Sequence, residues 1–316
     1  MKISAPNSFH RARRLLVVGA FSLIEIIVVV ALLSVIILGL LAMFSQTQKV
    51  FRTGLTQKDV LEAGRMASEM ISREFEQTVP SSRTLFNALN QPMLNFYAEI
   101  PAYTPFLQPL PGANHSRTNL IEDVFFLTRR NQEWVGIGYF VRTNHPTTGA
   151  LGVSALGGGT LYRFESSARI PLLPGVFPRD PGTLFQEFNV ARGNEFNTNV
   201  SRLLSGVIHF KVRAFDTNAA PVVGNPYATN RIWGILSGPA LKDGDAPGEV
   251  RLYQFYSNAV PASVEFELGV LENRVWERYQ ALPPAAQYNY LTNQAGKVHL
   301  FRQRVAIHNV DPKAYQ

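Results

Sequence analysis

The 316-residue sequence contains no cysteine, so disulfides, thiolate metal ligands and cysteine nucleophiles are excluded. Acidic residues are absent from the first twenty positions, which carry Lys2, Arg11, Arg13 and Arg14. The formal net charge of +7 comes from 30 basic and 23 acidic residues; without these four basic residues, 26 against 23 leave +3. The excess positive charge is therefore largely N-terminal, which disfavours nucleic acid as a partner of the rest of the chain.

Common enzyme motifs are missing as well. The chain has no HExxH zinc motif and no GxSxG nucleophile elbow. Gly157-Gly158-Gly159 is not followed by Gly-Lys-Ser/Thr, so it is expected to be a turn and not a phosphate-binding loop. Metal-ligand spacing is also lacking among the six histidines, which are His10, His115, His145, His209, His299 and His308. The sequence therefore favours a protein without catalysis, cofactor or metal.

One acidic cluster leaves a calcium site open. Asp243, Asp245 and Glu249 place three carboxylates within seven residues, and Ca²⁺ prefers oxygen ligands. The EF-hand pattern is absent, and Asp-Gly pairs such as Asp243-Gly244 are ordinary turn formers. An ordinary turn is the preferred interpretation, with calcium binding as the alternative.

An apolar run from Leu15 to Phe44 dominates the N-terminus. It is long enough to span a bilayer, which takes about 20 residues, and too long for the apolar region of a secretory signal peptide. Four basic residues precede the run, whereas only Lys49 and Arg52 follow closely. The positive-inside rule then keeps the N-terminus in the cytoplasm and exports the rest of the chain.

Glu25 is the one ionisable residue inside this run. A charged side chain at the centre of a membrane helix costs about 2.5–3.5 kcal/mol on insertion scales. Cleavage between Ala20 and Phe21 would create an α-amino group near this carboxylate, and each charge would favour the other. Such a pair could form within one chain or between neighbouring chains, where it would set the register of assembly.

The segment Ala20-Phe21-Ser22-Leu23-Ile24-Glu25 resembles the processing site of type IV prepilins and type II secretion pseudopilins. This resemblance implies that prepilin peptidase cuts after Ala20, that Phe21 becomes the N-methylated first residue, and that Glu25 directs subunit docking. The family usually has Gly at the position of Ala20, and the leader here ends in an unusually apolar stretch. Gly19 therefore remains the alternative position for the cut.

Residues 45–79 are expected to continue the membrane helix of residues 21–44 as its amphipathic half. They contain no proline, and an apolar residue recurs every fourth position, which defines one helix face that can pack on a sheet: Ala63, Ala67, Ile71, Phe75 and Val79. Pro80 ends the pattern. Gly39, Gly54 and Gly64 are positions where the helix could bend.

Residues 80–316 are expected to form an exported, β-rich globular head. Residues 124–127 and 134–141 suggest a hairpin, and residues 161–164 a further short strand. Three later segments alternate apolar and polar residues, as a half-buried strand does: 207–215, 262–270 and 298–309. Residues 166–200 and 217–250 show no clear periodicity and are expected to be insertions that decorate the head. The sequence thus predicts an α+β fold, with a long N-terminal helix packed on an antiparallel sheet.

Polar side chains suggest how two of these strands pair. His209, Lys211 and Arg213 form a basic row on one strand, and Glu265 and Glu267 an acidic row on another. We predict that the strands are neighbours, with both rows on one exposed face, because opposite charges across strands stabilise their register. Two separately solvated faces are the alternative.

The order of the head segments is similar to that of large minor subunits: J-type pseudopilins, PilW-like pilins and Verru_Chthon cassette prepilin-type proteins. This resemblance implies a minor, non-enzymatic subunit of a type IV pilus or type II secretion pseudopilus. Its partners would be prepilin peptidase, other pilins or pseudopilins, the inner-membrane assembly platform and membrane lipid. The protein would cross the inner membrane once, with its head in the periplasm or at the cell surface. The alternative is a membrane-anchored extracytoplasmic enzyme or binding module with a prepilin-like anchor.

Overall fold

A computed structural model describes ten ranges of the chain: residues 22–101, 106–109, 116–131, 133–144, 150–152, 158–168, 180–194, 196–224, 231–236 and 250–315. The chain divides into two compact units, Met1–Gly54 and Leu55–Gln316. The long helix α1 (Leu23–Glu76) contributes residues to both units. The two units are described separately below.

In the first unit, α1 is an apolar helix whose side chains are exposed over residues 22–52. Hydroxyl groups along it bind carbonyls of the preceding helical turn. The hydroxyl of Ser34 donates to the carbonyl of Val30 at 2.8 Å, and that of Thr47 donates to the carbonyl of Met43 at 2.9 Å. The helix is long and apolar enough to cross a membrane, and no residue of its most apolar stretch is buried in the protein. It therefore fits a single membrane span or signal anchor.

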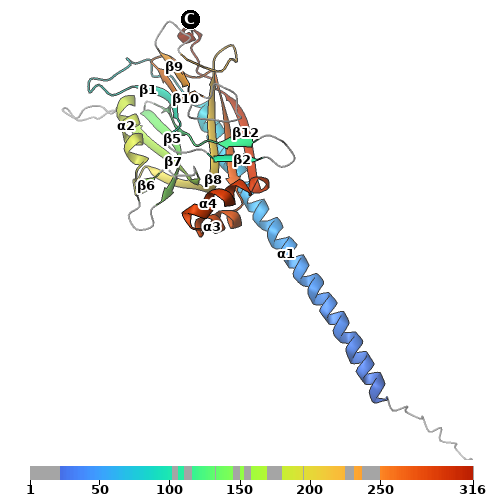
Figure 1. Cartoon of the computed structure of the whole chain (residues 1–316). Coiled ribbons are helices and arrows are strands. Elements are labelled where there is room, and N and C mark those ends of the chain that lie inside the picture. Colours follow the sequence, from blue (N-terminus) through green and yellow to red (C-terminus); the bar gives the residue numbers. More distant parts are fainter. Residues whose placement is uncertain are drawn as a thin grey trace, which may run out of the picture. The chain divides into compact units, whose positions relative to one another are not determined.

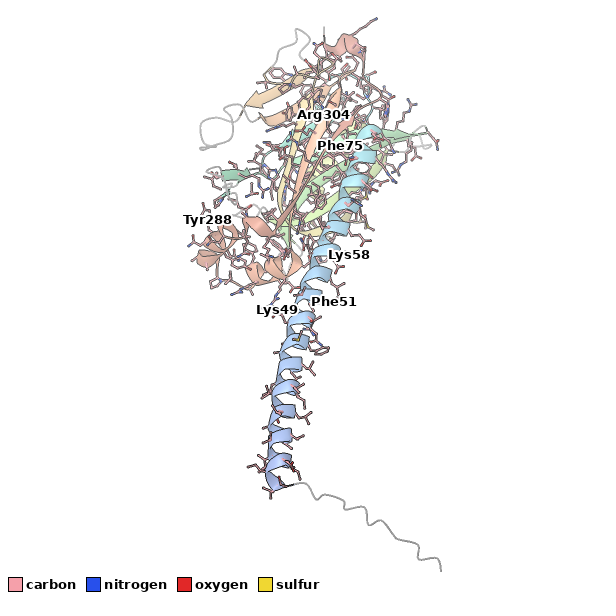
Figure 2. All side chains as sticks on the ribbon, turned by 90° about the vertical axis from the view of Figure 1, so that its right-hand side faces the viewer. Lys49, Phe51, Lys58, Phe75, Tyr288 and Arg304 are labelled. Atoms are coloured by element: carbon pink, nitrogen blue, oxygen red, sulfur yellow. The ribbon has the colours of Figure 1, made fainter. Side chains whose placement is uncertain are left out.

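In the second unit, the last part of α1 buries one face against a sheet. Ala67, Ile71 and Phe75 are buried, as the four-residue repeat predicts, while Ala63 and Val79 are half-buried. Phe75, labelled in Figure 2, contacts the rings of Phe96, Phe126 and Phe266 at centroid distances of 6.2, 4.8 and 6.0 Å. This apolar face fixes the helix on the sheet.

The helix ends at Glu76, three residues before the predicted end at Val79. Competition from the sheet explains the difference. Thr78 forms a β-bridge with Thr128, and the amide of Val79 donates to the carbonyl of Leu127 at 3.0 Å. The backbone here binds strand β4 (Asp123–Arg130) instead of continuing the helix.

Twelve strands form the β-structure of the described residues. They are β1 (Leu94–Glu99), β2 (Phe106–Pro109), β3 (Ser116–Asn119), β4 (Asp123–Arg130), β5 (Glu133–Asn144), β6 (Leu151–Gly152), β7 (Gly159–Ala168), β8 (Val200–Phe215), β9 (Ile232–Leu236), β10 (Val250–Tyr256), β11 (Ser263–Leu271) and β12 (Val298–Ala306). The main sheet has the order β12-β11-β8-β7-β5-β4-β1-β10-β9, with β6 added to β5, and β2 pairs with β3 separately. Every one of these neighbouring strand pairs is antiparallel. The α+β class predicted from the sequence is confirmed.

Alternate residues of the strands serve two cores. Phe126 of β4 lies in the core that contains Ile71 and Phe75 of α1. Its neighbour Phe125 lies in a second core with Phe185 and Phe188. Because successive side chains of a strand point to opposite faces, both faces of the sheet are covered.

Three helices were not predicted. α2 (Pro181–Ala191) lies in the segment without clear periodicity and packs along β5 and β7 (Figure 1). Its carboxylate cap, Asp180, accepts from the amide of Thr183 at 2.9 Å. α3 (Asn273–Gln280) and α4 (Pro284–Thr292) lie between β11 and β12 and pack on each other. Segment 166–200 is therefore partly core structure, and not only surface decoration.

The predicted strands are all present. The hairpin of residues 124–127 and 134–141 is β4–β5, and its turn contains Asn131 with a left-handed φ of 54°. Residues 161–164 lie in β7, and 207–215, 262–270 and 298–309 correspond to β8, β11 and β12. The prediction for β8 was incomplete, because this strand begins at Val200 and spans 16 residues.

Candidate functional site

The start of α1 carries the candidate assembly residue. The backbone amide of Ser22 donates to Oε2 of Glu25 at 2.9 Å, and the amide of Glu25 donates to Oγ of Ser22 at 3.3 Å. This reciprocal pair is a capping box, which satisfies two amides that have no partner within the helix. Glu25 is exposed, and no basic side chain forms an ion pair with it among the residues described. The capping box is a structural reason for a glutamate at this position, and it is separate from the predicted role of Glu25 in assembly.

The predicted cleavage site lies outside the described residues. Ala20, Phe21 and the alternative Gly19 all precede Ser22, where the description of the chain begins. The structure thus places Glu25 in the first helical turn and leaves the cleavage and N-methylation of Phe21 as predictions.

In the second unit, Glu74 connects α1 to the sheet through a nearly buried ion pair. Its Oε1 accepts from Nη2 of Arg163 on β7 at 2.6 Å, and their side chains are only 13% and 15% exposed. The hydroxyl of Tyr139 on β5 also donates to Glu74. Arg163 in turn pairs with Glu165, which accepts from Arg130 at 2.6 Å. Four elements are joined by this network, since Arg130 comes from β4.

The pKa shifts follow from this geometry. Burial and the neighbouring Glu74 carboxylate raise the pKa of Tyr139 well above its ordinary value, so its hydroxyl remains a donor. Burial opposes ionisation of Glu165, but the hydrogen bonds and charges of Arg163 and Arg130 outweigh it and lower the pKa of this carboxyl. Glu165 therefore stays ionised beside both arginines, and the network serves to hold the helix on the sheet.

A second buried cluster surrounds Asp123 of β4, which is fully buried. Arg142 of β5 binds both carboxylate oxygens, with a distance of 2.6 Å to Oδ1. Arg192, just after α2, donates to Oδ2 at 2.8 Å and lies 3.9 Å from Glu99. Two arginines thus balance two carboxylates, as buried charges require, and the cluster joins α2 to the sheet.

The predicted pairing of charged rows is confirmed in its topology. β8 and β11 are adjacent and antiparallel, with Lys211 opposite Glu267 and Arg213 opposite Glu265. Arg213 and Glu265 approach to 3.8 Å. The predicted exposure is wrong for two residues, however, because His209 and Lys211 are only 1% and 4% exposed.

Residues 120–122 explain this burial. Ile121 forms a parallel bridge with Phe210, the amide of Leu120 donates to Nδ1 of His209 at 3.0 Å, and the Glu122 carboxylate accepts from the amide of Val212 at 2.9 Å. The segment before β4 therefore runs beside β8 and excludes water from the basic row. Because Nδ1 of His209 is an acceptor, its Nε2 carries the proton and donates to Glu267 at 3.3 Å.

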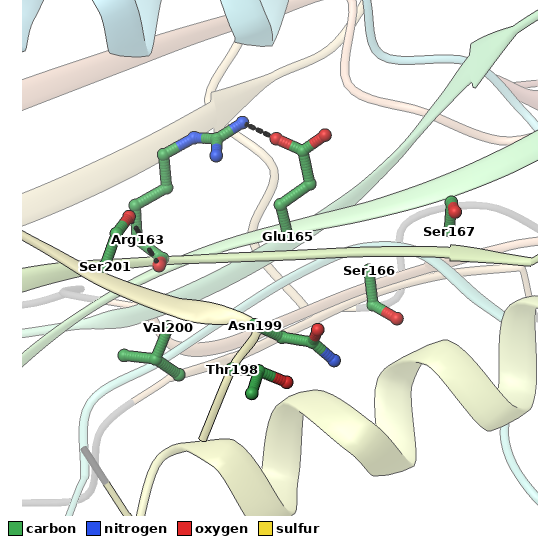
Figure 3. Close-up of a pocket in the computed structure, with 8 residues that line it drawn as sticks. All are labelled: Arg163, Glu165, Ser166, Ser167, Thr198, Asn199, Val200 and Ser201. Atoms are coloured by element: carbon green, nitrogen blue, oxygen red, sulfur yellow. Dashed lines mark hydrogen bonds and ion pairs between the residues drawn. The ribbon is translucent and has the colours of Figure 1, made fainter. Parts of the chain in front are cut away.

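A polar cleft of about 400 Å³ lies where β7 extends beyond the start of β8. Hydroxyl and amide side chains dominate its lining, together with one arginine and one glutamate (Figure 3): Arg163, Glu165, Ser166, Ser167, Thr198, Asn199, Val200 and Ser201. Both charged groups are already ion-paired, and Oγ of Ser166 donates to Glu187 of α2 at 2.6 Å. These contacts already engage Arg163, Glu165 and Ser166 within the protein.

The remaining candidate residues are widely separated or undescribed. Asp243, Asp245 and Glu249, the possible calcium ligands, lie outside the described residues, as do His10, His115 and His145. Within the described ranges, no three His, Asp or Glu side chains are grouped so that they could hold a metal ion. Comparison of the chain with protein-family models, curated proteins and solved structures finds no match.

Proposed function

We propose that this chain is the precursor of a prepilin-like structural subunit. Prepilin peptidase removes residues 1–20, Phe21 becomes the N-methylated first residue, and the helix from Phe21 to Phe44 anchors the mature chain in the inner membrane. The product enters a type IV pilus or a type II secretion pseudopilus as a minor, non-catalytic subunit. Its other partners are pilins or pseudopilins, the inner-membrane assembly platform and lipid, and its head lies in the periplasm or at the cell surface.

The observation that carries this proposal is the contact between Ser22 and Glu25 at the start of an exposed apolar helix. Cleavage after Ala20 would put a new α-amino group on the residue immediately before Ser22, whose amide already binds the Glu25 carboxylate. A positive charge at that position lowers the cost of keeping the carboxylate ionised in lipid. A neighbouring subunit's amine can take the same role during assembly.

The size of the second unit supports a minor position. It extends from Leu55 to Gln316 and carries the main sheet with two covered faces. Heads of this bulk crowd a helical lattice, so a subunit present once or a few times fits better than a repeating one.

Conservative substitutions at Glu25 separate assembly from capping. Glu25→Gln keeps a side chain that can accept from Ser22 but loses the charge, whereas Glu25→Ala loses both. We expect both variants to enter the membrane, because insertion depends on the apolar run, and both to be depleted from sheared filaments. The matched control is Glu62→Gln, an exposed glutamate of the same helix. Normal incorporation of Glu25→Gln would show that Glu25 is only a helix cap and would contradict the assembly role.

A further inference from the structure

The two outer strands of the main sheet differ in how their edges are covered. At β9, Gly224 and Gly234 exchange two backbone hydrogen bonds of 2.6 and 2.7 Å, so that edge is capped at its centre. At β12, nine consecutive residues pair with β11 without a bulge, and no described residue pairs with the opposite side. β12 thus presents a regular, open edge in the part of the chain that the structure describes.

The hydrogen-bond pattern identifies the outward backbone groups. The amide of Ile307 donates to the carbonyl of Ala262, and the amide of Glu272 donates to the carbonyl of Lys297. In an antiparallel pair, hydrogen-bonded residues alternate, so the odd-numbered residues of β12 bind β11. The even-numbered residues direct their N–H and C=O groups outward: Val298, Leu300, Arg302, Arg304 and Ala306. Four of these five are exposed and Val298 is half-exposed.

From this edge we infer that β12 binds an extended segment of another protein by strand addition, and that the segment carries an acidic residue opposite Arg304. Hydrogen bonds from the outward backbone groups of β12 provide the affinity, and contacts of alternate side chains provide the specificity, as in other complexes formed by strand addition. This inference goes beyond the proposed function, because it concerns the head and is independent of cleavage or filament entry.

Arg304 determines the charge of the partner. Its guanidinium lies 3.9 Å from the ring centroid of Phe215 and donates to Oγ of Ser263 at 3.0 Å, but no carboxylate pairs with it among the described residues. Arg302, by contrast, already binds Glu265 at 2.8 Å and lies 3.5 Å from Glu267. An acidic side chain of the segment opposite Arg304 would balance the positive charge of this arginine. The residues on either side of that acidic residue would lie beside Gln303 and Val305, on the opposite face of the sheet.

A second copy of this chain fits the edge poorly. Antiparallel self-pairing centred on Arg302 or on Gln303 would place arginine directly opposite arginine, and like charges at such positions are destabilising. Arginines on an edge strand thus hinder self-association while leaving the backbone available to an acidic segment.

The test uses the full chain in detergent micelles and a synthetic nine-residue peptide, Ser-Val-Glu-Val-Glu-Val-Glu-Val-Ser, blocked at both ends. At a peptide concentration about ten times its Kd, amide hydrogen exchange over residues 298–306 is expected to slow about tenfold. A peptide with lysine in place of glutamate should bind about threefold more weakly, because it loses the exposed ion pair with Arg304. A peptide methylated at the alternate amides that would face β12 should not bind, because it cannot donate hydrogen bonds to the outward carbonyls.

Two substitutions at Arg304 separate the contribution of its charge to binding from that of the backbone hydrogen bonds. Arg304→Gln removes only the charge and should lower affinity for the acidic peptide about threefold. Arg304→Pro also removes an outward N–H without removing a β11 hydrogen bond, and it should abolish binding. Ala306→Pro removes a second outward N–H and serves if the first proline variant does not fold. No protection of residues 298–306, equal binding of the acidic and lysine peptides, or wild-type binding by the proline variants would overturn the inference.

Discussion

Gly64 of α1 lies against the ring of Phe301 in β12, so closely that a β-carbon at position 64 would come within 2.2 Å of ring atom Cε2. Gly64 is buried, whereas nothing lies within 4 Å of the corresponding positions at Gly39 and Gly54. The sequence suggested all three glycines as bending points, yet α1 continues through each of them. At Gly64 the absent side chain instead allows the helix to approach the sheet.

Gly64→Ala is therefore expected to destabilise the head, although alanine favours helices. Overpacking against Phe301 costs about 1–3 kcal/mol, which equals or exceeds the gain of about 1 kcal/mol in helix propensity. Chemical denaturation followed by tryptophan fluorescence measures the difference. Gly54→Ala is the control and should not lower stability. If Gly64→Ala is as stable as this control, the contact does not limit packing.

Glu74→Ala should lower the free energy of unfolding by about 3 kcal/mol, because it leaves the nearly buried Arg163 without one carboxylate and Tyr139 without its acceptor. The matched control is Glu69→Ala, one turn earlier, which removes an exposed ion pair with Arg73 of 3.8 Å and should cost about 0.5 kcal/mol or less. The double variant Glu74→Met with Arg163→Met should lose less stability than Glu74→Ala alone, because no charge is left without its partner. Equal melting temperatures for the two alanine variants would contradict a role of Glu74 in holding α1.

The contact between His209 and Glu267 makes the head sensitive to acid. The hydrogen bond from His209 lowers the pKa of Glu267 to about 2, and burial lowers the pKa of His209 below its ordinary value. Both groups bind more protons in the unfolded state, so stability decreases as the pH falls. The contribution of Glu267 is complete above about pH 4.5 and is lost as the pH approaches 2.

Glu267→Gln should therefore lower the melting temperature at pH 7 but make it depend less on pH between 5 and 3. Melting curves across this range, with the exposed Glu277→Gln as the control, provide the measurement. A pH dependence equal to that of the unmodified protein would show that Glu267 does not contribute to acid sensitivity.

Much of the second unit could be predicted because its elements have simple periodicities. The four-residue repeat that contains Ile71 and Phe75 identifies the buried face of α1, and the alternation around Phe210 and Phe266 identifies two neighbouring strands. α2 was missed although Asp180-Pro181 is a helix start and Leu184, Phe185 and Phe188 share one face. The helix is short, and the sequence on either side of it shows no clear periodicity, so that pattern was missed.

The polar clusters could not be predicted in the same way. Glu74 and Arg163 are 89 residues apart, and only the folded sheet brings them together. The burial of His209 depends on residues 120–122, which cross beside β8 and carry no periodic pattern of their own. Local sequence reports which face of a strand a residue occupies, but it does not report what later covers that face.

The proposed function requires that the chain is a precursor cut before Phe21. Intact-mass analysis of protein extracted from membranes of a host with an active prepilin peptidase tests this claim most directly. We expect a mature chain that lacks residues 1–20 and carries one additional methyl group on Phe21. A mass that corresponds to removal of residues 1–19 would move the cut to Gly19, and a chain that still begins at Met1 would contradict the prepilin proposal.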